Sequence, residues 1–284
     1  LEKTGVCMKI LLSPAKVNIG LWIVGKRDDG YHNIFSFFHT IDLNDRIVIK
    51  PSHNLSVKCS LLDPDLQEEK NIVYKTVVLF EKITGINQGW EIFIEKNIPV
   101  GGGLGGGSSN AAVVLQFLNT YYGNPISEKD LFDLAVKIGA DVPFFLKGGF
   151  ALAEGVGEKL TFFDQRLNDE LFLIYPNVKS NTGEVYSKVD KNMLTNKDDL
   201  NIILNLISEY GAKKIFEVAE NKLGDIAKTL YPEIEEVYKF LEYLGYKPFI
   251  TGSGSTVYCI GSPSEEVETA CKVRNWKLIK TRFK

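Results

Sequence analysis

Apolar and polar positions alternate through most of residues 9–50, with the period of two that is typical of β-strands. The segments that carry this pattern are rich in β-branched and aromatic residues. They are residues 9–12, 17–24, 33–41 and 46–50. Asp29-Gly30 indicates a turn after the second segment, and Asn44-Asp45 precedes the fourth, which we expect to be a separate strand.

The rest of the chain mixes helical and strand patterns. Residues 71–84 place apolar side chains three and four positions apart, so we expect an amphipathic helix that ends near Gly85. Further helices are expected at residues 108–122, 128–138, 199–209, 213–219, 224–230, 232–244 and 264–275, and further strands at residues 55–59, 90–95, 150–154, 171–175, 248–250, 256–260 and 277–281. Strands grouped early and helices later predict an α+β fold. We expect two domains, residues 8–160 and residues 161–284, with a soft boundary.

Composition narrows the class of protein. The chain has 284 residues, of which 44% are hydrophobic, so it can bury a sizeable core. The net charge of -3 argues against a nucleic-acid partner, because such proteins normally carry a basic excess. No apolar run is long enough for a membrane span, and residues 1–7, which lack the apolar core of a secretory signal, are expected to be an extension that precedes the fold.

The cysteines are widely separated and form no CxxC pair, so disulfide and zinc frameworks are not expected. They are Cys7, Cys59, Cys259 and Cys271. We interpret them as reduced thiols, which are typical of a cytoplasmic protein.

A glycine-rich run lies between a predicted strand and a predicted apolar helix. It consists of Pro99, Val100, Gly101, Gly102, Gly103, Leu104, Gly105, Gly106, Gly107, Ser108 and Ser109. Glycine allows positive φ angles, so successive backbone N–H groups can face one anion, and the following helix adds its own unpaired N–H groups. A triphosphate is the natural ligand. A flexible linker is the alternative, and the position between strand and helix argues against it.

Three other phosphate-binding motifs do not fit this run, because residues that they require are missing. A Walker loop needs a lysine before its serine, but Gly107 is followed directly by Ser108. The dinucleotide pattern matches through Gly101, Gly103 and Gly106, but a glycine tract satisfies it almost automatically, and the acidic residue expected about twenty positions later is missing. The His-Arg-Asp motif of protein kinases does not occur.

The remaining pattern, Pro-x-x-x-Gly-Leu-Gly-x-x-Ser-Ser over residues 99–109, resembles the second motif of the GHMP kinases. Residues 251–255, Thr-Gly-Ser-Gly-Ser, resemble the third. Residues 13–21 and Gly30-Tyr31-His32, with residues 139–145 and 153–158, resemble the branch that acts on a cytidine-diphosphate-linked methylerythritol. The resemblance extends from about Lys9 to the C-terminus.

The resemblance implies a two-domain GHMP kinase fold, with a ribosomal-protein-like N-terminal domain and a ferredoxin-like C-terminal domain. It also implies transfer of a phosphoryl group from ATP, with Mg²⁺, to the 2-hydroxyl of 4-diphosphocytidyl-2-C-methyl-D-erythritol. Asp141 is the expected general base, and Lys16 is the expected cation beside it. From the residues alone, Asp141 could equally be a helix N-cap. A lysine in a strand, such as Lys16, is usually on a solvated face.

Binding roles are implied in the same way. For ATP they fall on the glycine-rich run and on Lys96 and Asn71, with Ser108 or Ser109 meeting phosphate or Mg²⁺. The substrate-binding candidates are Asn18, Tyr31, His32, Tyr175, Gly252, Ser253 and Gly254. Aromatic rings among them can stack on cytosine, and an imidazole can read its edge. Mg²⁺ ligands are not identified, because Glu154 and Glu158 fit structural roles better.

Three alternatives remain from the sequence. The chain could be another GHMP kinase, acting on mevalonate, homoserine or a sugar. It could be a catalytically silent nucleotide-binding relative, although the presence of both Lys16 and Asp141 favours an enzyme. An RNA-binding module is disfavoured by the acidic balance. We expect a monomer or a weak homodimer whose partner is a small molecule, with no nucleic acid and no membrane.

Overall fold

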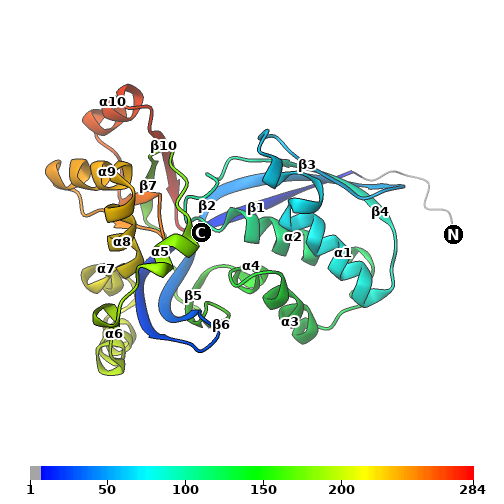
Figure 1. Ribbon diagram of the computed structural model, residues 1–284, viewed down its shortest axis with the longest axis horizontal. Coiled ribbons are helices and arrows are strands. Elements are labelled where there is room, and N and C mark those ends of the chain that lie inside the picture. The colour runs from blue at the N-terminus through cyan, green and yellow to red at the C-terminus, as the bar shows by residue number, and fades with distance from the viewer. Residues whose placement is uncertain (1–7) are drawn as a thin grey trace. The chain divides into compact units, whose positions relative to one another are not determined.

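The computed structural model describes residues 8–284, so the expectations about residues 1–7 and Cys7 lie outside the described residues. The described chain divides into two compact units (Figure 1). Unit 1 contains residues 8–15, 43–98 and 106–147, and unit 2 contains residues 16–42, 99–105 and 148–284. Neither unit is one continuous segment. The linear division into residues 8–160 and 161–284 therefore stays a prediction.

The sheet of unit 1 is built on strand β4 (Gly89–Glu95). The second half of strand β2 (His32–Ser52) pairs with it in antiparallel register, from Arg46 opposite Glu95 to Ser52 opposite Gly89. Strand β3 (Ser56–Cys59) pairs with the other edge of β4 in parallel register. Every second residue of β4 is buried, as its alternating sequence predicts.

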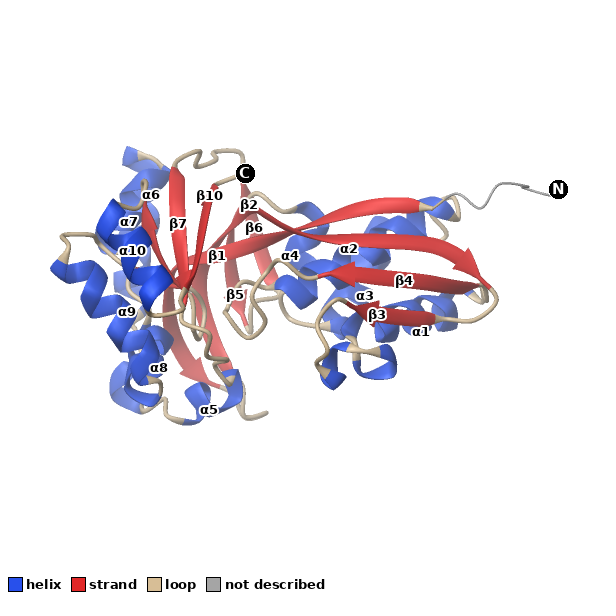
Figure 2. Ribbon diagram, turned by 90° about the horizontal axis from the view of Figure 1, so that it is seen from above, coloured by secondary structure: helices blue, strands red, loops and turns tan. Residues whose placement is uncertain are grey.

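Four helices complete unit 1: α1 (Ile72–Thr84), α2 (Gly106–Tyr121), α3 (Glu128–Ile138) and α4 (Val142–Lys147). Helices α1 and α2 lie along one face of β3 and β4 (Figure 2). The ring of Trp90 in β4 makes edge contacts with Phe117 and Tyr121 of α2. Short 3₁₀ turns at Pro64–Leu66 and Glu68–Lys70 lead into α1. The core of unit 1 lies between this sheet and these helices.

Unit 2 contains strands from both ends of the chain. The first half of β2 pairs in antiparallel register with β5 (Phe150–Gly155), which pairs with β6 (Lys159–Phe163), while β1 (Lys9–Lys26) pairs with β2. A second, four-stranded antiparallel sheet has the order β10-β7-β9-β8. Its strands are β7 (Glu170–Tyr175), β8 (Phe249–Ile250), β9 (Val257–Ile260) and β10 (Lys277–Arg282).

Helices α8 (Lys222–Leu230), α9 (Pro232–Tyr243) and α10 (Glu265–Val273) lie on one face of this second sheet (Figure 2). They bury Ile226, Val237 and Val267 against Phe172 and Ile174 of β7. The helices of unit 2 are α5 (Thr182–Ser187), α6 (Lys197–Tyr210), α7 (Ile215–Val218), α8 (Lys222–Leu230), α9 (Pro232–Tyr243) and α10 (Glu265–Val273), with 3₁₀ turns at Lys191–Met193 and Ala212–Lys214.

Most predicted elements are confirmed within a few residues, but the expectation of a separate strand after Asn44-Asp45 is wrong. Strand β2 runs through both residues, because the Asp45 side chain points into the protein and makes hydrogen bonds there instead of forming a turn. Strand β6 and helices α4 and α5 were not predicted. They are short, and a short element leaves little periodicity in the sequence.

Two composition-based predictions can be compared with the described residues. Cys59, Cys259 and Cys271 are free and buried, as expected, and burial raises the pKa of the Cys259 thiol to about 12. Among residues 8–284, we find no helix with the length and apolar character that a membrane span requires.

Candidate active site

The centre of the glycine-rich run is held in unit 2 through its carbonyl groups. The carbonyls of Gly101 and Gly102 accept the N–H groups of Ser180 (3.1 Å) and Thr256 (3.2 Å). The carbonyl of Leu104 accepts the N–H of Lys16 at 3.0 Å. By contrast, the N–H groups of Gly103, Leu104 and Gly105 donate to no other residue in the part of the chain that the structure describes. The segment is therefore fixed in place with donors left over for a ligand.

Glycine is required at Gly103 for two reasons. Its φ angle is 75°, which favours glycine, and a Cβ atom there would lie 2.2 Å from the Thr251 carbonyl oxygen. The Thr251 hydroxyl donates to the Gly103 carbonyl at 3.0 Å and accepts the N–H of Asn18 at the same distance. The second and third glycine motifs of the sequence therefore pack directly on each other within unit 2.

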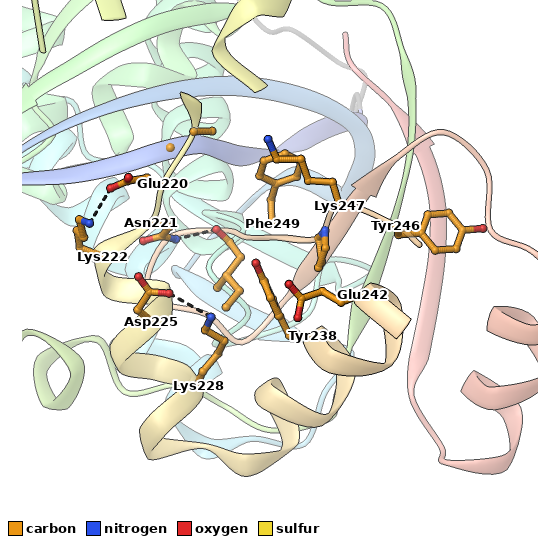
Figure 3. A pocket seen from close by; sticks show the side chains of 14 residues that line it. Glu220, Asn221, Lys222, Asp225, Lys228, Tyr238, Glu242, Tyr246, Lys247 and Phe249 are labelled. Carbon is orange, nitrogen blue, oxygen red and sulfur yellow. Dashed lines mark hydrogen bonds and ion pairs between the residues drawn. The ribbon is translucent and has the colours of Figure 1, made fainter. Parts of the chain in front are cut away.

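The third motif is held from behind by Asn221, which precedes α8. The Asn221 side-chain amide donates to the carbonyls of Ile250 (2.7 Å) and Gly252 (2.8 Å), while its oxygen accepts the N–H of Gly224 and caps the helix. Asn221 lines a hollow of about 470 Å³ formed by α8, α9 and β8, and Figure 3 labels it among the lining side chains. Two ion pairs lie in this wall, Lys228 with Asp225 and Lys222 with Glu220.

Ser253, a candidate in the same motif, is 6% exposed. Its carbonyl accepts the hydroxyl of Ser180 at 2.6 Å, and its own hydroxyl lies 2.9 Å from that of Thr182. Gly252 and Gly254 have φ angles of 57° and 86°, so both positions favour glycine. The motif is a tightly held turn.

Lys16 is 4% exposed and lies in β1. Its ammonium donates to the side-chain oxygen of Asn18 at 2.5 Å and lies 4.4 Å from the centre of the Phe38 ring. Asn18 is itself oriented, because its amide donates to the Ser36 hydroxyl and its backbone carbonyl accepts the buried hydroxyl of Tyr258. These contacts fix the position of the ammonium within unit 2.

Asp141 belongs to unit 1, where it is partly buried and directly precedes helix α4. Val142 and Phe144, the first and third residues of that helix, are fully buried and anchor it. Because Lys16 and Asp141 belong to different units, their pairing stays a prediction.

The predicted base-binding residues lie at the hairpin between β1 and β2. The expected turn is confirmed, with Gly30 at a φ angle of 88° and the N–H of Arg27 bonded to the Tyr31 carbonyl. The Tyr31 ring is 65% exposed, whereas His32 is buried and stacks on Tyr186 with ring centres 5.4 Å apart. Burial and, to a smaller extent, Lys26 lower the pKa of His32 below its usual value, which favours the neutral imidazole.

Tyr186 was missed by the sequence analysis because helix α5 was not recognised. A signal was present: Asn181 caps this helix and accepts the N–H of Glu184, three positions later. Tyr175, the aromatic residue proposed from the sequence, instead donates its hydroxyl to the Val100 carbonyl at 3.1 Å. It therefore supports the glycine-rich run, and its contact with substrate stays a prediction.

In unit 1 the proposed nucleotide residues have structural partners. The Asn71 side chain accepts the N–H of Val73 at 2.9 Å, capping α1, and donates to the Leu66 carbonyl at 2.6 Å. The Lys96 ammonium is buried in an ion pair with Asp45. Ser109 is fully buried and accepts a hydrogen bond from Ser13, whereas Ser108 is partly exposed.

Two family models match the chain: the N-terminal domain of GHMP kinases at residues 71–149 and the C-terminal domain at residues 212–276. A 4-diphosphocytidyl-2-C-methyl-D-erythritol kinase of Sulfurihydrogenibium sp. (strain YO3AOP1) is 61% identical over 98% of this chain and 100% of its own length. The chain belongs to this kinase family. The same kinase of Persephonella marina is 56% identical over 96% of the chain and 99% of its own length.

Solved structures agree with the diphosphocytidyl-methylerythritol kinase family. A crystal structure of a 4-(cytidine 5'-diphospho)-2C-methyl-D-erythritol kinase has a TM-score of 0.77 at 30% identity, covering 97% of this chain and 99% of that one. A mevalonate kinase, at 16% identity, has a TM-score of 0.68 over 97% and 99% of the two chains, which shows a shared fold. The predicted α+β GHMP kinase fold is confirmed, and the protein is an ATP-dependent small-molecule kinase.

The described residues of the chain are compatible with a magnesium ion that binds through the phosphates of ATP. Within residues 8–284, no three His, Cys, Asp or Glu side chains gather as a metal site would require. Mg²⁺ needs no such cage, since it commonly keeps several waters and binds through substrate phosphates with one or two protein ligands. The Glu158 carboxylate accepts the N–H of Val156 at 2.7 Å, as a structural residue does.

Proposed function

We propose that this chain transfers the γ-phosphoryl group of ATP to the 2-hydroxyl of 4-diphosphocytidyl-2-C-methyl-D-erythritol, in the non-mevalonate route to isoprenoid precursors. Among the relatives described above, those that carry this kinase name are up to 61% identical to the chain. The observation that carries the proposal within the chain is the glycine-rich run, whose carbonyls are bonded while N–H groups of Gly103, Leu104 and Gly105 remain available.

In the proposed reaction the glycine-rich run binds the triphosphate through these backbone donors. The first turn of α2 adds N–H groups at the positive end of the helix dipole. Ser108, which is partly exposed, is the better placed of the two serines to contact a phosphate or its metal, because Ser109 is buried against Ser13. Mg²⁺, bound through the phosphates, would neutralise charge on the transferred group.

Asp141 is the proposed general base, which accepts the proton of the 2-hydroxyl as its oxygen attacks phosphorus. Lys16 is the proposed cation that stabilises the negative charge of the reacting groups. Asn18 and the Phe38 ring fix the direction of its ammonium before substrate binds. Positioning of this kind matters more than basicity in phosphoryl transfer.

The cytosine of the substrate is proposed to bind at the β1–β2 hairpin. The exposed Tyr31 ring offers a stacking surface, and the lowered pKa of the adjacent His32 favours its neutral form, in which one ring nitrogen can donate while the other accepts. Tyr186 holds the imidazole by stacking on it. Gly252, Ser253 and Gly254 are proposed to support the phosphates or the reacting alcohol.

We also infer a cytoplasmic protein that acts as a monomer or a weak homodimer. The free, buried thiols of Cys59, Cys259 and Cys271 fit a reducing compartment. Analytical ultracentrifugation across a range of concentrations tests the assembly state, and a stable larger oligomer would contradict it.

An assay that couples ADP release to a visible signal tests the activity. We expect rapid turnover with ATP, Mg²⁺ and 4-diphosphocytidyl-2-C-methyl-D-erythritol, and almost none with mevalonate or homoserine. Proton-decoupled phosphorus NMR of the product should show a new phosphomonoester on the 2-hydroxyl. Faster turnover of mevalonate or homoserine, or a product phosphorylated at another hydroxyl, would contradict the proposal.

A further inference from the structure

Asp45 lies in the middle of β2, and its side chain is completely buried in unit 1. One carboxylate oxygen accepts the N–H groups of Asn97 at 2.8 Å and Ile98 at 2.9 Å. These residues end the segment that leads into Pro99, which has no N–H of its own. Asp45 therefore binds the last two backbone donors before the glycine-rich run.

The other carboxylate oxygen of Asp45 contacts the chain on the far side of the run. It accepts the side-chain amide of Asn110, in helix α2, at 3.0 Å. The same amide donates to the Ser13 hydroxyl at 2.8 Å, and Ser13 in turn donates to Ser109 at 2.8 Å. One buried carboxylate thus holds both the entry to the glycine-rich run and the helix that follows it.

The Lys96 ammonium completes this cluster. It forms an ion pair with Asp45 and donates to the side-chain oxygen of Asn110 at 3.3 Å. It also contributes to close packing, because a Cβ atom on Gly106, the first residue of α2, would lie 3.1 Å from the Lys96 nitrogen. The cluster satisfies the buried charge of Asp45 with a cation and with hydrogen bonds from both flanks, as a buried carboxylate requires.

Fixed ends matter for this run because glycine loses more conformational freedom than other residues when it is ordered. If the two flanks are held at a constant separation, less ordering remains to be done when a triphosphate binds. We infer that Asp45 is a positioning residue for ATP: it presets the two ends of the glycine-rich run and so sets the affinity for the nucleotide. The inference rests on the proposed binding of triphosphate by that run.

The experiment compares Asp45→Asn with Asp42→Asn. Both substitutions remove a carboxylate from β2, but Asp42 is about half exposed and pairs with Lys284 at the surface. We expect Asp45→Asn to raise the KM for ATP about tenfold or more, because the ends of the run lose a charged tether, and to change the KM for the alcohol less than about threefold. Asp42→Asn should match the parent in both constants.

Asn110→Ala serves as a second variant, since it keeps the Asp45–Lys96 ion pair and removes the Asn110 hydrogen bonds to Asp45, Ser13 and Lys96. It should raise the KM for ATP in the same direction by a smaller factor, so the inference remains testable if Asp45→Asn does not fold. An unchanged KM for ATP in a less stable variant would show a purely structural role and overturn the inference. Equal increases in both KM values would also overturn it.

Calorimetric titration with ATP separates this inference from the proposed function. If the parent binds ATP and Asp45→Asn binds it equally well, only the inference fails. If the parent does not bind ATP, the proposed role of the glycine-rich run fails first, and the inference falls with it. We expect tight binding by the parent and about tenfold weaker binding by Asp45→Asn, matching the change in KM.

Discussion

Lys16 and Lys96 are both almost completely buried, but their surroundings differ. The Lys16 residue is 4% exposed, and the Lys96 side chain is 6% exposed. Lys96 meets the carboxylate of Asp45 within unit 1, where its charge is neutralised. Lys16, within unit 2, contacts an amide oxygen and the face of a phenyl ring. The Asp45 carboxylate neutralises the buried Lys96 ammonium, whereas the Asn18 amide oxygen and the Phe38 ring orient the Lys16 ammonium within unit 2. Burial alone therefore does not distinguish a lysine that builds the fold from one suited to catalysis.

The substitutions with the largest expected effect act on the chemical step and lower kcat. Lys16→Met should lower kcat by roughly 10²- to 10³-fold, because it removes a fixed charge that stabilises the reacting groups.

Asp141→Asn should lower kcat by roughly 10²- to 10⁴-fold while ATP binds nearly as in the parent. Steady-state kinetics with calorimetric ATP titration measure both. Asp133→Asn, at an exposed position of α3, is the control and should not alter kcat. Substantial turnover by Asp141→Asn would show that Asp141 is not the general base.

Lys96→Met should act on stability. It leaves the buried Asp45 carboxylate without its cation, so the free energy of unfolding should fall by about 3–5 kcal/mol. Lys50→Met is the matched control: Lys50 in β2 pairs with Glu91 in β4 but its side chain is 39% exposed, so its loss should cost about 1 kcal/mol or less. Urea denaturation measures both. The double variant Asp45→Asn, Lys96→Met should recover part of the loss, and equal costs for the two lysines would contradict the comparison.

His39 provides a third buried basic side chain, and this one is neutral. It is fully buried, donates from Nδ1 to the Thr40 carbonyl and accepts the N–H of Leu167 at Nε2. Burial, with a smaller contribution from Arg166, lowers its pKa from 6.5 to about 4. Below pH 6.5 the unfolded chain therefore takes up a proton that the folded chain does not. Stability should fall by about 3 kcal/mol as the pH falls from about 6.5 to about 4.

Urea denaturation of the parent and of His39→Gln at pH 7 and pH 5 measures this contribution. The variant should be less stable at pH 7 and should lose less stability on acidification. His32, whose pKa is also lowered, adds a change of the same sign in both proteins and cancels in the difference. Identical pH dependence in parent and variant would show that His39 is not the titrating group.

The smallest expected effect concerns the Thr251 hydroxyl, which bonds to Asn18 and to the glycine-rich run. Thr251→Val should reduce the free energy of unfolding by about 1–3 kcal/mol, because the Asn18 N–H and the Gly103 carbonyl both lose the hydroxyl. Thr251→Ser keeps the hydroxyl and should retain most of the stability. Thermal denaturation distinguishes them. If Thr251→Val also lowers kcat, Asn18 transmits the change to the Lys16 ammonium; if kcat is unchanged, the ammonium is oriented independently of Thr251.

The regular elements and the motifs were predictable from sequence because they depend on local pattern. Helix α3 begins and ends where its capping residues predict, and the glycine-rich run is recognisable from its residue types alone. The partner of a buried charge is different, because it depends on residues far apart in the chain. Nothing local indicates that Asp45, 51 positions away, holds the Lys96 ammonium, and the predicted contact of Lys96 with ATP stays a prediction. The stacking of Tyr186 on His32 likewise exists only in the folded chain, although the Asn181 cap of its helix was a local signal.

The discontinuous composition of the two units has a consequence for synthesis on the ribosome. All residues of unit 1 have been made once residue 147 is added, whereas unit 2 waits for residues up to 284. Residues 16–42 are among the first to emerge, yet the segments that complete their unit are translated last. These early strands must be kept from pairing wrongly in the interval. A slowdown in translation after residue 147 would lengthen this exposure, so codon choice in that stretch bears on the yield of active enzyme.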